Sequence, residues 1–143
     1  MLTHRNNTAK EDLYLIDKST GKTIGKSTGS SKTYEVEYTH KILDAIKKMQ
    51  TNTIISIHNH PTNIPPSGSD FVSAGYRRYT KGVVVCHNGD VYVYEPGNRP
   101  FSAKLFDDTV EKYKKNGYNK GIEANLKTLK QFEKDYGIKW RRL

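Results

Sequence analysis

The sequence predicts an α/β fold, and three observations lead to that prediction. Short alternating or β-branched runs recur along the first two thirds of the chain, amphipathic stretches of helical period separate them, and the pattern turns helical from residue 102 onward. At 143 residues the chain has the length of one domain. No internal repeat or linker-like segment interrupts it, so we expect one α/β domain with a helical C-terminal extension.

The first two strands are expected close to the N-terminus. In "EDLYLID" the residues alternate with period two, Leu13 and Leu15 on one face and Tyr14 and Ile16 on the other. A Gly-containing turn in "KSTGKTIGKSTG" accompanies a second strand around residues 23–26. The next run, "SSKTYEVEY", is short and alternating, and it fits either a strand or an extended connection.

Helix and strand signals alternate through the middle of the chain. "HKILDAIKKM" predicts an amphipathic helix over residues 39–50, because its lysines lie opposite four apolar side chains at helical spacing: Ile42, Leu43, Ile46 and Met49. "TIISIH" is a β-branched run typical of a buried strand. "SDFVSAGYRRY" then predicts a second helix.

A hairpin and a helical extension complete the chain. In "KGVVVCHNGDVYVYEPG" two alternating strands flank Asn88-Gly89, a pair suited to a type I′ turn. After residue 102 we expect helices with a break at "NGYNKG", a last helix over residues 121–136, and "GIKWRRL" as a tail. We therefore divide the chain into a core over residues 1–100 and a basic helical extension over residues 101–143 that packs on the same domain.

Composition excludes several classes of protein. Hydrophobic residues make up 34% of the chain. No run approaches the roughly 20 apolar residues that span a bilayer, and the N-terminal residues lack the apolar centre of a signal peptide. The single cysteine, Cys86, excludes an internal disulfide framework and a cysteine-rich zinc finger. We expect a soluble cytoplasmic chain that has no membrane contact.

The formal net charge of +9 suits an acidic partner such as nucleic acid. "YRRY" and "KWRR" interleave aromatic and cationic residues, as surfaces that bind nucleic acid do. A lysine-rich solvated surface is the simpler explanation of the charge, so nucleic acid stays an alternative partner.

The segment "SIHNHPTNIPPSGSD" places metal-binding side chains at the end of the predicted strand. His58 and His60 are two residues apart and share a face, so both imidazoles can reach one ion. Pro61 then directs the chain out of the sheet, and the loop delivers Ser67 and Asp70 to the next helix. Two imidazoles and one carboxylate are a catalytic zinc set that leaves a fourth position for water.

A structural explanation competes with the metal site for Asp70, and a second candidate pair of ligands is excluded. Ser67 and Asp70 also have the spacing of a capping box at a helix start, so Asp70 taken alone is better explained as a capping acid. Cys86 and His87 are adjacent in a strand and point to opposite faces, which prevents them from sharing an ion.

"HNHPTNIPPSGSD" resembles the JAMM motif of JAB/MPN-type zinc metalloproteases, an upstream glutamate followed by H-x-H-P and S-x-x-D. "HNHP" also resembles the RadC family, and the segment as a whole is similar to the JAB-like domains appended to phage head-morphogenesis proteins. Nine residues separate His60 from Asp70, one fewer than the family commonly has. The resemblance covers about residues 11–95. It implies a mixed β-sheet flanked by helices, of the cytidine-deaminase-like type, in a chain that is virion-associated if it belongs to a phage structural protein.

The resemblance also implies a role for each site residue. His58, His60 and Asp70 would ligate Zn²⁺, Glu11 would act as the proton shuttle, and Ser67 would stabilise the negative charge that develops on the attacked carbonyl oxygen. Glu35 and Glu37 compete with Glu11, but Glu11 lies directly before the first strand, where the family has its glutamate.

The expected function is hydrolysis of a protein or peptide amide by a zinc metallopeptidase or isopeptidase. The alternative is a non-hydrolytic module on the same scaffold that binds nucleic acid or serves phage virion assembly. The sequence names neither the substrate nor the oligomeric state.

Overall fold

The computed structural model describes residues 11–28, 40–49 and 53–143, so the run "SSKTYEVEY" lies outside the described residues. Its strands are β1 (Asp12–Asp17), β2 (Thr23–Thr28), β3 (Ile54–His60), β4 (Lys81–Cys86), β5 (Val91–Glu95) and β6 (Lys139–Arg142). Its helices are α2 (His40–Lys48), α3 (Gly68–Tyr76), α4 (Ala103–Lys115) and α5 (Glu123–Tyr136).

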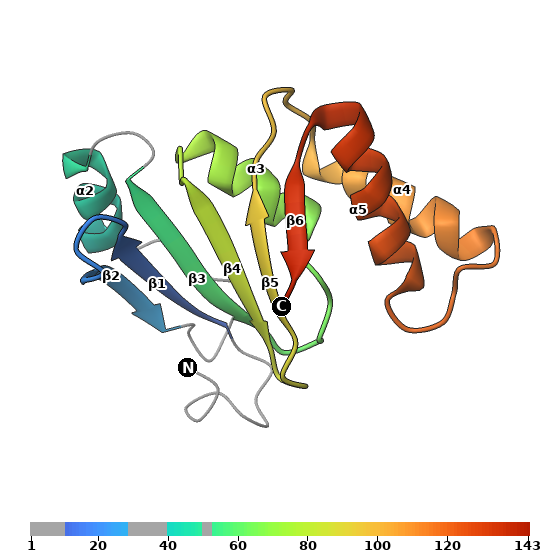
Figure 1. Cartoon of the computed structure of the whole chain (residues 1–143), viewed down its shortest axis with the longest axis horizontal. Coiled ribbons are helices and arrows are strands. Elements are labelled where there is room, and N and C mark those ends of the chain that lie inside the picture. The colour runs from blue at the N-terminus through green and yellow to red at the C-terminus, as the bar shows by residue number, and fades with distance from the viewer. Residues whose placement is uncertain (1–10, 29–39, 50–52) are drawn as a thin grey trace.

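The six strands form one sheet in the order β2-β1-β3-β4-β5-β6 (Figure 1). β3 and β4 are parallel, and every other neighbouring pair is antiparallel. The parallel pair requires a crossover, and α3 lies in it. The predicted α/β class and the mixed sheet are therefore confirmed.

The helices α2 and α3 lie on the same side of the sheet (Figure 1). A Cβ added at Gly25 of β2 would lie 3.5 Å from Cγ1 of Ile42 in α2 and 3.6 Å from Cδ1 of Leu15 in β1. Phe71 of α3 packs edge-on against Tyr94 of β5, with ring centroids 5.1 Å apart. The face of the sheet that carries Gly25, Leu15 and Tyr94 therefore points toward these helices, as the alternation in the sequence predicts.

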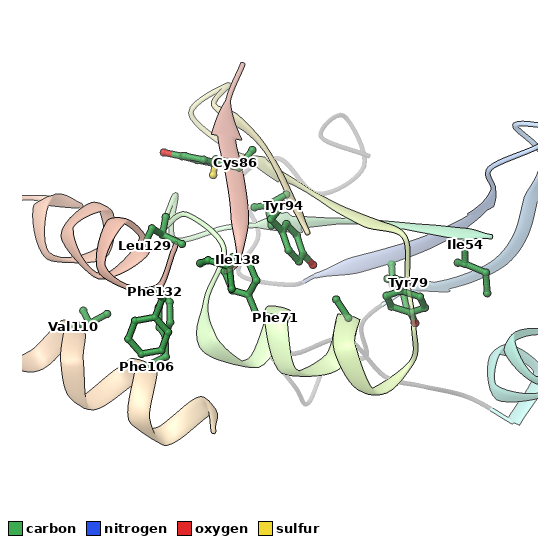
Figure 2. Packing of buried hydrophobic residues seen from close by; sticks show 14 of the residues in the cluster. Ile54, Phe71, Tyr79, Cys86, Tyr94, Phe106, Val110, Leu129, Phe132 and Ile138 are labelled. Atoms are coloured by element: carbon green, nitrogen blue, oxygen red, sulfur yellow. The ribbon is translucent and has the colours of Figure 1, made fainter. Parts of the chain in front are cut away.

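The C-terminal helices extend the same core (Figure 2). Phe106 of α4 and Phe132 of α5 are buried, and their ring centroids lie 4.9 Å apart. Phe106 also packs against Phe71 of α3 at 6.1 Å. The helices α4 and α5 therefore share a core with α3 and the sheet.

The tail is the main difference from the sequence prediction, because "KWRR" forms β6 and not an irregular end. β6 pairs antiparallel with β5, with Trp140 opposite Tyr94. Gly137, in the left-handed region at φ 72°, ends α5 and lets the chain turn back to the sheet edge. The extension thus contributes a strand as well as two helices.

The β4–β5 turn also differs from the prediction. A type I′ turn at Asn88-Gly89 requires positive φ at both residues, but only Gly89 has it, at 96°. The Gly89 N–H donates to the Cys86 carbonyl, and the Cys86 N–H donates to the Asp90 carbonyl. This is a three-residue loop closed by a glycine bulge.

Among the described residues, none of the helices is long and apolar enough to cross a membrane.

Phe132→Ala is expected to lower the free energy of unfolding of the whole domain by about 3–5 kcal/mol, because it leaves a cavity in the shared aromatic core. Leu105→Ala, at a 42% exposed position of α4, is the control and should change stability by no more than about 0.5 kcal/mol. Urea unfolding followed by circular dichroism measures both. A separate, early transition for the helices would show that the extension is an independent unit.

Candidate metal centre

The end of β3 presents two histidines on the covered face of the sheet. His58 and His60 are only 6% and 4% exposed, and their Nε2 atoms lie 3.0 Å apart. They stand where the parallel strand β3 ends and the chain leaves for α3. The crevice outside the carboxyl ends of strands is a common place for ligand sites in α/β folds.

Asp70 reaches the same point from the first turn of α3. Its Oδ1 lies 3.0 Å from Nε2 of His58, and its Oδ2 lies 3.3 Å from Nε2 of His60. The Ser67 backbone N–H donates to Oδ2 at 2.7 Å, so Asp70 also caps the helix. Asp70 can therefore cap the helix and bind a metal ion at the same time.

The shortened loop still brings Asp70 to the histidines. Asn63 adopts a left-handed φ of 60°, which turns the chain tightly after β3. The loop directs the Ile64 carbonyl at Nδ1 of His60, 2.8 Å away. Nδ1 must donate this bond, so Nε2 is left to bind an ion, which is how outer hydrogen bonds commonly orient histidine ligands.

The three side chains fit a small divalent ion. His58, His60 and Asp70 form the cluster whose ligand atoms lie within 4.8 Å of one another. A tetrahedral ion with bonds of about 2.0–2.2 Å holds its ligands roughly 3.3 Å apart, close to the separations here. Facing Nε2 lone pairs repel unless a proton or a metal ion lies between them. Two imidazoles and a carboxylate suit zinc.

The charges of the cluster are strongly coupled. Burial alone would raise the pKa of Asp70, but His58 and His60 hold it well below its usual range. Burial alone would lower the pKa of His60, but Asp70, the Ile64 carbonyl and Glu11 together raise it to about 9. Without metal, a proton on His60 therefore balances the carboxylate at neutral pH.

The predicted site residues line one cavity of about 300 Å³. Glu11 lies in it directly before β1, and Ser67 lies in it at the start of α3. The competing Glu35 and Glu37 lie outside the described residues. The full lining is Glu11, Leu13, Ser56, His58, His60, Thr62, Ile64, Ser67, Ser69, Asp70, Ser73, Tyr79 and Tyr94.

Cys86 and His87 do not join this cluster. The Cys86 side chain is buried beside the loop, its Sγ 3.5 Å from the Ile64 carbonyl oxygen. Burial raises the pKa of its thiol to about 11, which keeps it protonated and unsuited to binding metal or attacking a substrate. His87 lies 2.8 Å, Nε2 to Nδ2, from Asn59.

Sequence reasoning missed two supporting groups, the Ile64 carbonyl and Asn59. The carbonyl depends on the loop conformation and leaves no signal in the sequence. Asn59 does leave one, because an amide between two inward-facing histidines in a strand must face the opposite side of the sheet. It is fully buried there, and its Oδ1 accepts the Asp12 N–H at 2.7 Å.

Comparison with protein-family models, with curated proteins and with solved structures finds no match to this chain. The chemistry of the site therefore has to be inferred from the geometry and the motif.

Zinc binding at about pH 7 is expected to release about one to two protons. His60 is protonated below its pKa of about 9 and must lose one proton to ligate, and water bound to zinc loses part of a second because its pKa falls to about 7. Titration calorimetry in two buffers of different ionisation enthalpy measures the number. At about pH 10 the release should fall to about one proton, because His60 is already neutral and the remaining proton comes from the zinc-bound water. A proton count that is the same at both pH values would contradict the assigned ligand.

Proposed function

We propose that this chain is a zinc-dependent peptidase or isopeptidase of the JAMM type that hydrolyses a protein or peptide amide bond. One observation carries the proposal: a buried His58–His60–Asp70 cluster shares a cavity with Glu11 and Ser67. Together they supply a metal site, a base and a hydrogen-bond donor.

The residues divide the reaction between them. Zinc held by the three ligands would polarise the substrate carbonyl and lower the pKa of water to about 7. Glu11 takes a proton from the attacking water and passes it to the leaving amine nitrogen. The Ser67 hydroxyl donates a hydrogen bond to the carbonyl oxygen as negative charge develops there. No nucleophilic serine or cysteine is needed.

The charge of the cavity favours an amide over a phosphodiester substrate. The described lining holds two carboxylates and several hydroxyl groups, but neither lysine nor arginine. Because Glu11 and Asp70 would already balance the charge of the bound ion, the added negative charge of a phosphate group would find no lysine or arginine in the lining to pair with. A neutral amide needs no such pairing.

The arrangement of elements supports the JAB/MPN assignment. The motif lies at the end of β3, the next helix begins at its serine and aspartate, and β4 returns parallel to β3. A mixed sheet with a helix beginning at the motif is what the resemblance implies. A cytoplasmic or virion-associated location, as for JAB-like domains of phage head-morphogenesis proteins, is part of the same proposal.

A second candidate function is nucleic-acid binding by a non-hydrolytic module. The observation that favours it is β6, where Lys139 and Arg141 are exposed on one face of the strand and the half-buried Trp140 lies on the other. Arg142 contributes less, because its guanidinium pairs with the Asp90 carboxylate at 2.7 Å. Phage virion assembly without hydrolysis belongs to the same alternative.

Glu11→Gln is expected to keep bound zinc and stability yet lose activity by about 10²–10⁴-fold, because it removes a proton carrier and no ligand. Asp70→Asn should lose zinc affinity, since it removes an anionic ligand, and also some stability through the weakened cap. Metal content, melting temperature and proteome-wide cleavage profiling against the wild type measure these effects.

The control is His87→Ala, which should retain zinc, whereas His58→Ala should not. Loss of zinc in Glu11→Gln together with its retention in Asp70→Asn would reverse the roles of base and ligand. Retention of zinc in His58→Ala would refute the metal site.

If the second function holds, Lys139→Ala combined with Arg141→Ala should weaken binding of single-stranded DNA or RNA and flatten its salt dependence. Fluorescence anisotropy over a range of salt concentrations tests this. Salt-dependent binding by wild type and Glu11→Gln alike, with cleavage by neither, would favour the binding module over the peptidase.

A further inference from the structure

Asn59 lies between the two histidines but serves the other face of the sheet. Its side chain is fully buried, and a buried amide is costly unless it is hydrogen-bonded. Both of its polar atoms have defined partners, Asp12 at the start of β1 and His87 in the β4–β5 loop. Asn59 therefore joins segments that are far apart in the sequence.

The amide oxygen fixes the start of β1. The ladder between β1 and β3 reaches the pair Leu13–His58, and Oδ1 of Asn59 extends it by accepting the Asp12 N–H at 2.7 Å. That N–H belongs to the peptide group that joins Glu11 to Asp12. Because this peptide group is planar, orienting it places the Cα of Glu11.

The amide nitrogen fixes which way the side chain faces. Since Oδ1 must accept from a backbone N–H, Nδ2 is the atom that faces His87, 2.8 Å away. Nδ2 can only donate, so Nε2 of His87 accepts. His87 thereby holds the amide in the orientation that Asp12 requires.

We propose that Asn59 is a positioning residue that sets Glu11 over the metal ligands, with His87 orienting its amide. The inference rests on the proposed function, in which Glu11 carries the proton. It assigns Asn59 no contact with substrate or metal. The residue acts through the backbone of β1, from the opposite face of the strand that bears His58 and His60.

Asn59→Leu removes both hydrogen bonds at similar volume. Activity should fall about 10²-fold, the cost of displacing a reacting group by about 1 Å, while zinc content stays at the wild-type level. In a Glu11→Gln background the same change should cost less than about twofold, because a residue that acts through Glu11 has nothing left to position. Full additivity of the two losses would mean a merely structural role and overturn the proposal.

A second readout needs no substrate. Acetohydroxamic acid loses a proton when it chelates a metal, and a carboxylate beside the metal can accept that proton. Its dissociation constant is measured from the visible spectrum of the Co²⁺-loaded protein. Glu11→Gln should weaken hydroxamate binding. Asn59→Leu should weaken it by most of the amount that Glu11→Gln does.

Two further variants keep the test sharp if Asn59→Leu folds poorly. His87→Ala removes only the acceptor that orients the amide and should weaken hydroxamate binding in the same direction. Asn63→Gly is the matched control. In the wild type the Asn63 side chain accepts a hydrogen bond from the Asn88 N–H of the same hairpin, and this variant removes it. Glycine tolerates the positive φ of residue 63, so the backbone is kept. Hydroxamate binding should therefore stay unchanged.

The hydroxamate measurements distinguish the positioning role of Asn59 from the proposed peptidase function. Weaker hydroxamate binding in Glu11→Gln but not in Asn59→Leu or His87→Ala would overturn the positioning role and leave the proposed function intact. Wild-type binding by Glu11→Gln would overturn both, because Glu11 would then not act at the metal.

Discussion

The site depends on one interaction, the placement of the Asp70 carboxylate against two imidazoles at the end of β3. Its oxygens lie 3.0 Å and 3.3 Å from the two Nε2 atoms, and one of them also accepts the Ser67 N–H. The same group therefore fixes the start of α3, the end of β3 and the charge of the cluster. An isolated buried carboxylate is costly, so the cluster needs a proton or a metal ion to remain in place.

Strand alternation places His58 and His60 on one face of β3 and Asn59 on the other. The two histidines face the cavity, whereas Asn59 faces the other side and bonds to the Asp12 N–H. One short stretch of β3 thus carries two candidate metal ligands on one face and bonds to the neighbouring strand from the other. Substitutions at adjacent positions are therefore expected to have different consequences, loss of metal at the histidines and displacement of β1 at the asparagine.

Much of the fold was predictable because its signals are local. Alternation revealed β1 and the hairpin, helical spacing revealed α2, and the turn to a helical pattern revealed α4 and α5. β6 was not predictable, because "KWRR" is short and charged and becomes a strand only by pairing with the open edge of β5. The hairpin loop was misjudged because Asn88-Gly89 suits two loop types. The Asn63 side chain, which accepts the Asn88 N–H, belongs to a distant loop.

The geometry of the candidate site was predictable for a different reason, since its side chains are concentrated in one segment. His58, His60, Ser67 and Asp70 fall within thirteen residues of sequence, and the motif also indicated Glu11. The supports could not be found in this way. The Ile64 carbonyl acts through backbone geometry, and the Asn59–His87 bond joins two positions whose separation in space no local pattern reveals.

The cavity and the surface of this chain differ in charge, and the difference bears on what each can bind. The chain carries a formal charge of +9, yet the described cavity lining contains neither lysine nor arginine. A divalent ion held beside Asp70 and Glu11 would be neutralised by those two carboxylates, which is the condition under which a buried ionic site is tolerated. The surface charge would then affect how an acidic partner approaches. If the chain hydrolyses an amide as proposed, its substrate meets a neutral, hydroxyl-lined cavity, and an uncharged amide suits that cavity better than a phosphate does.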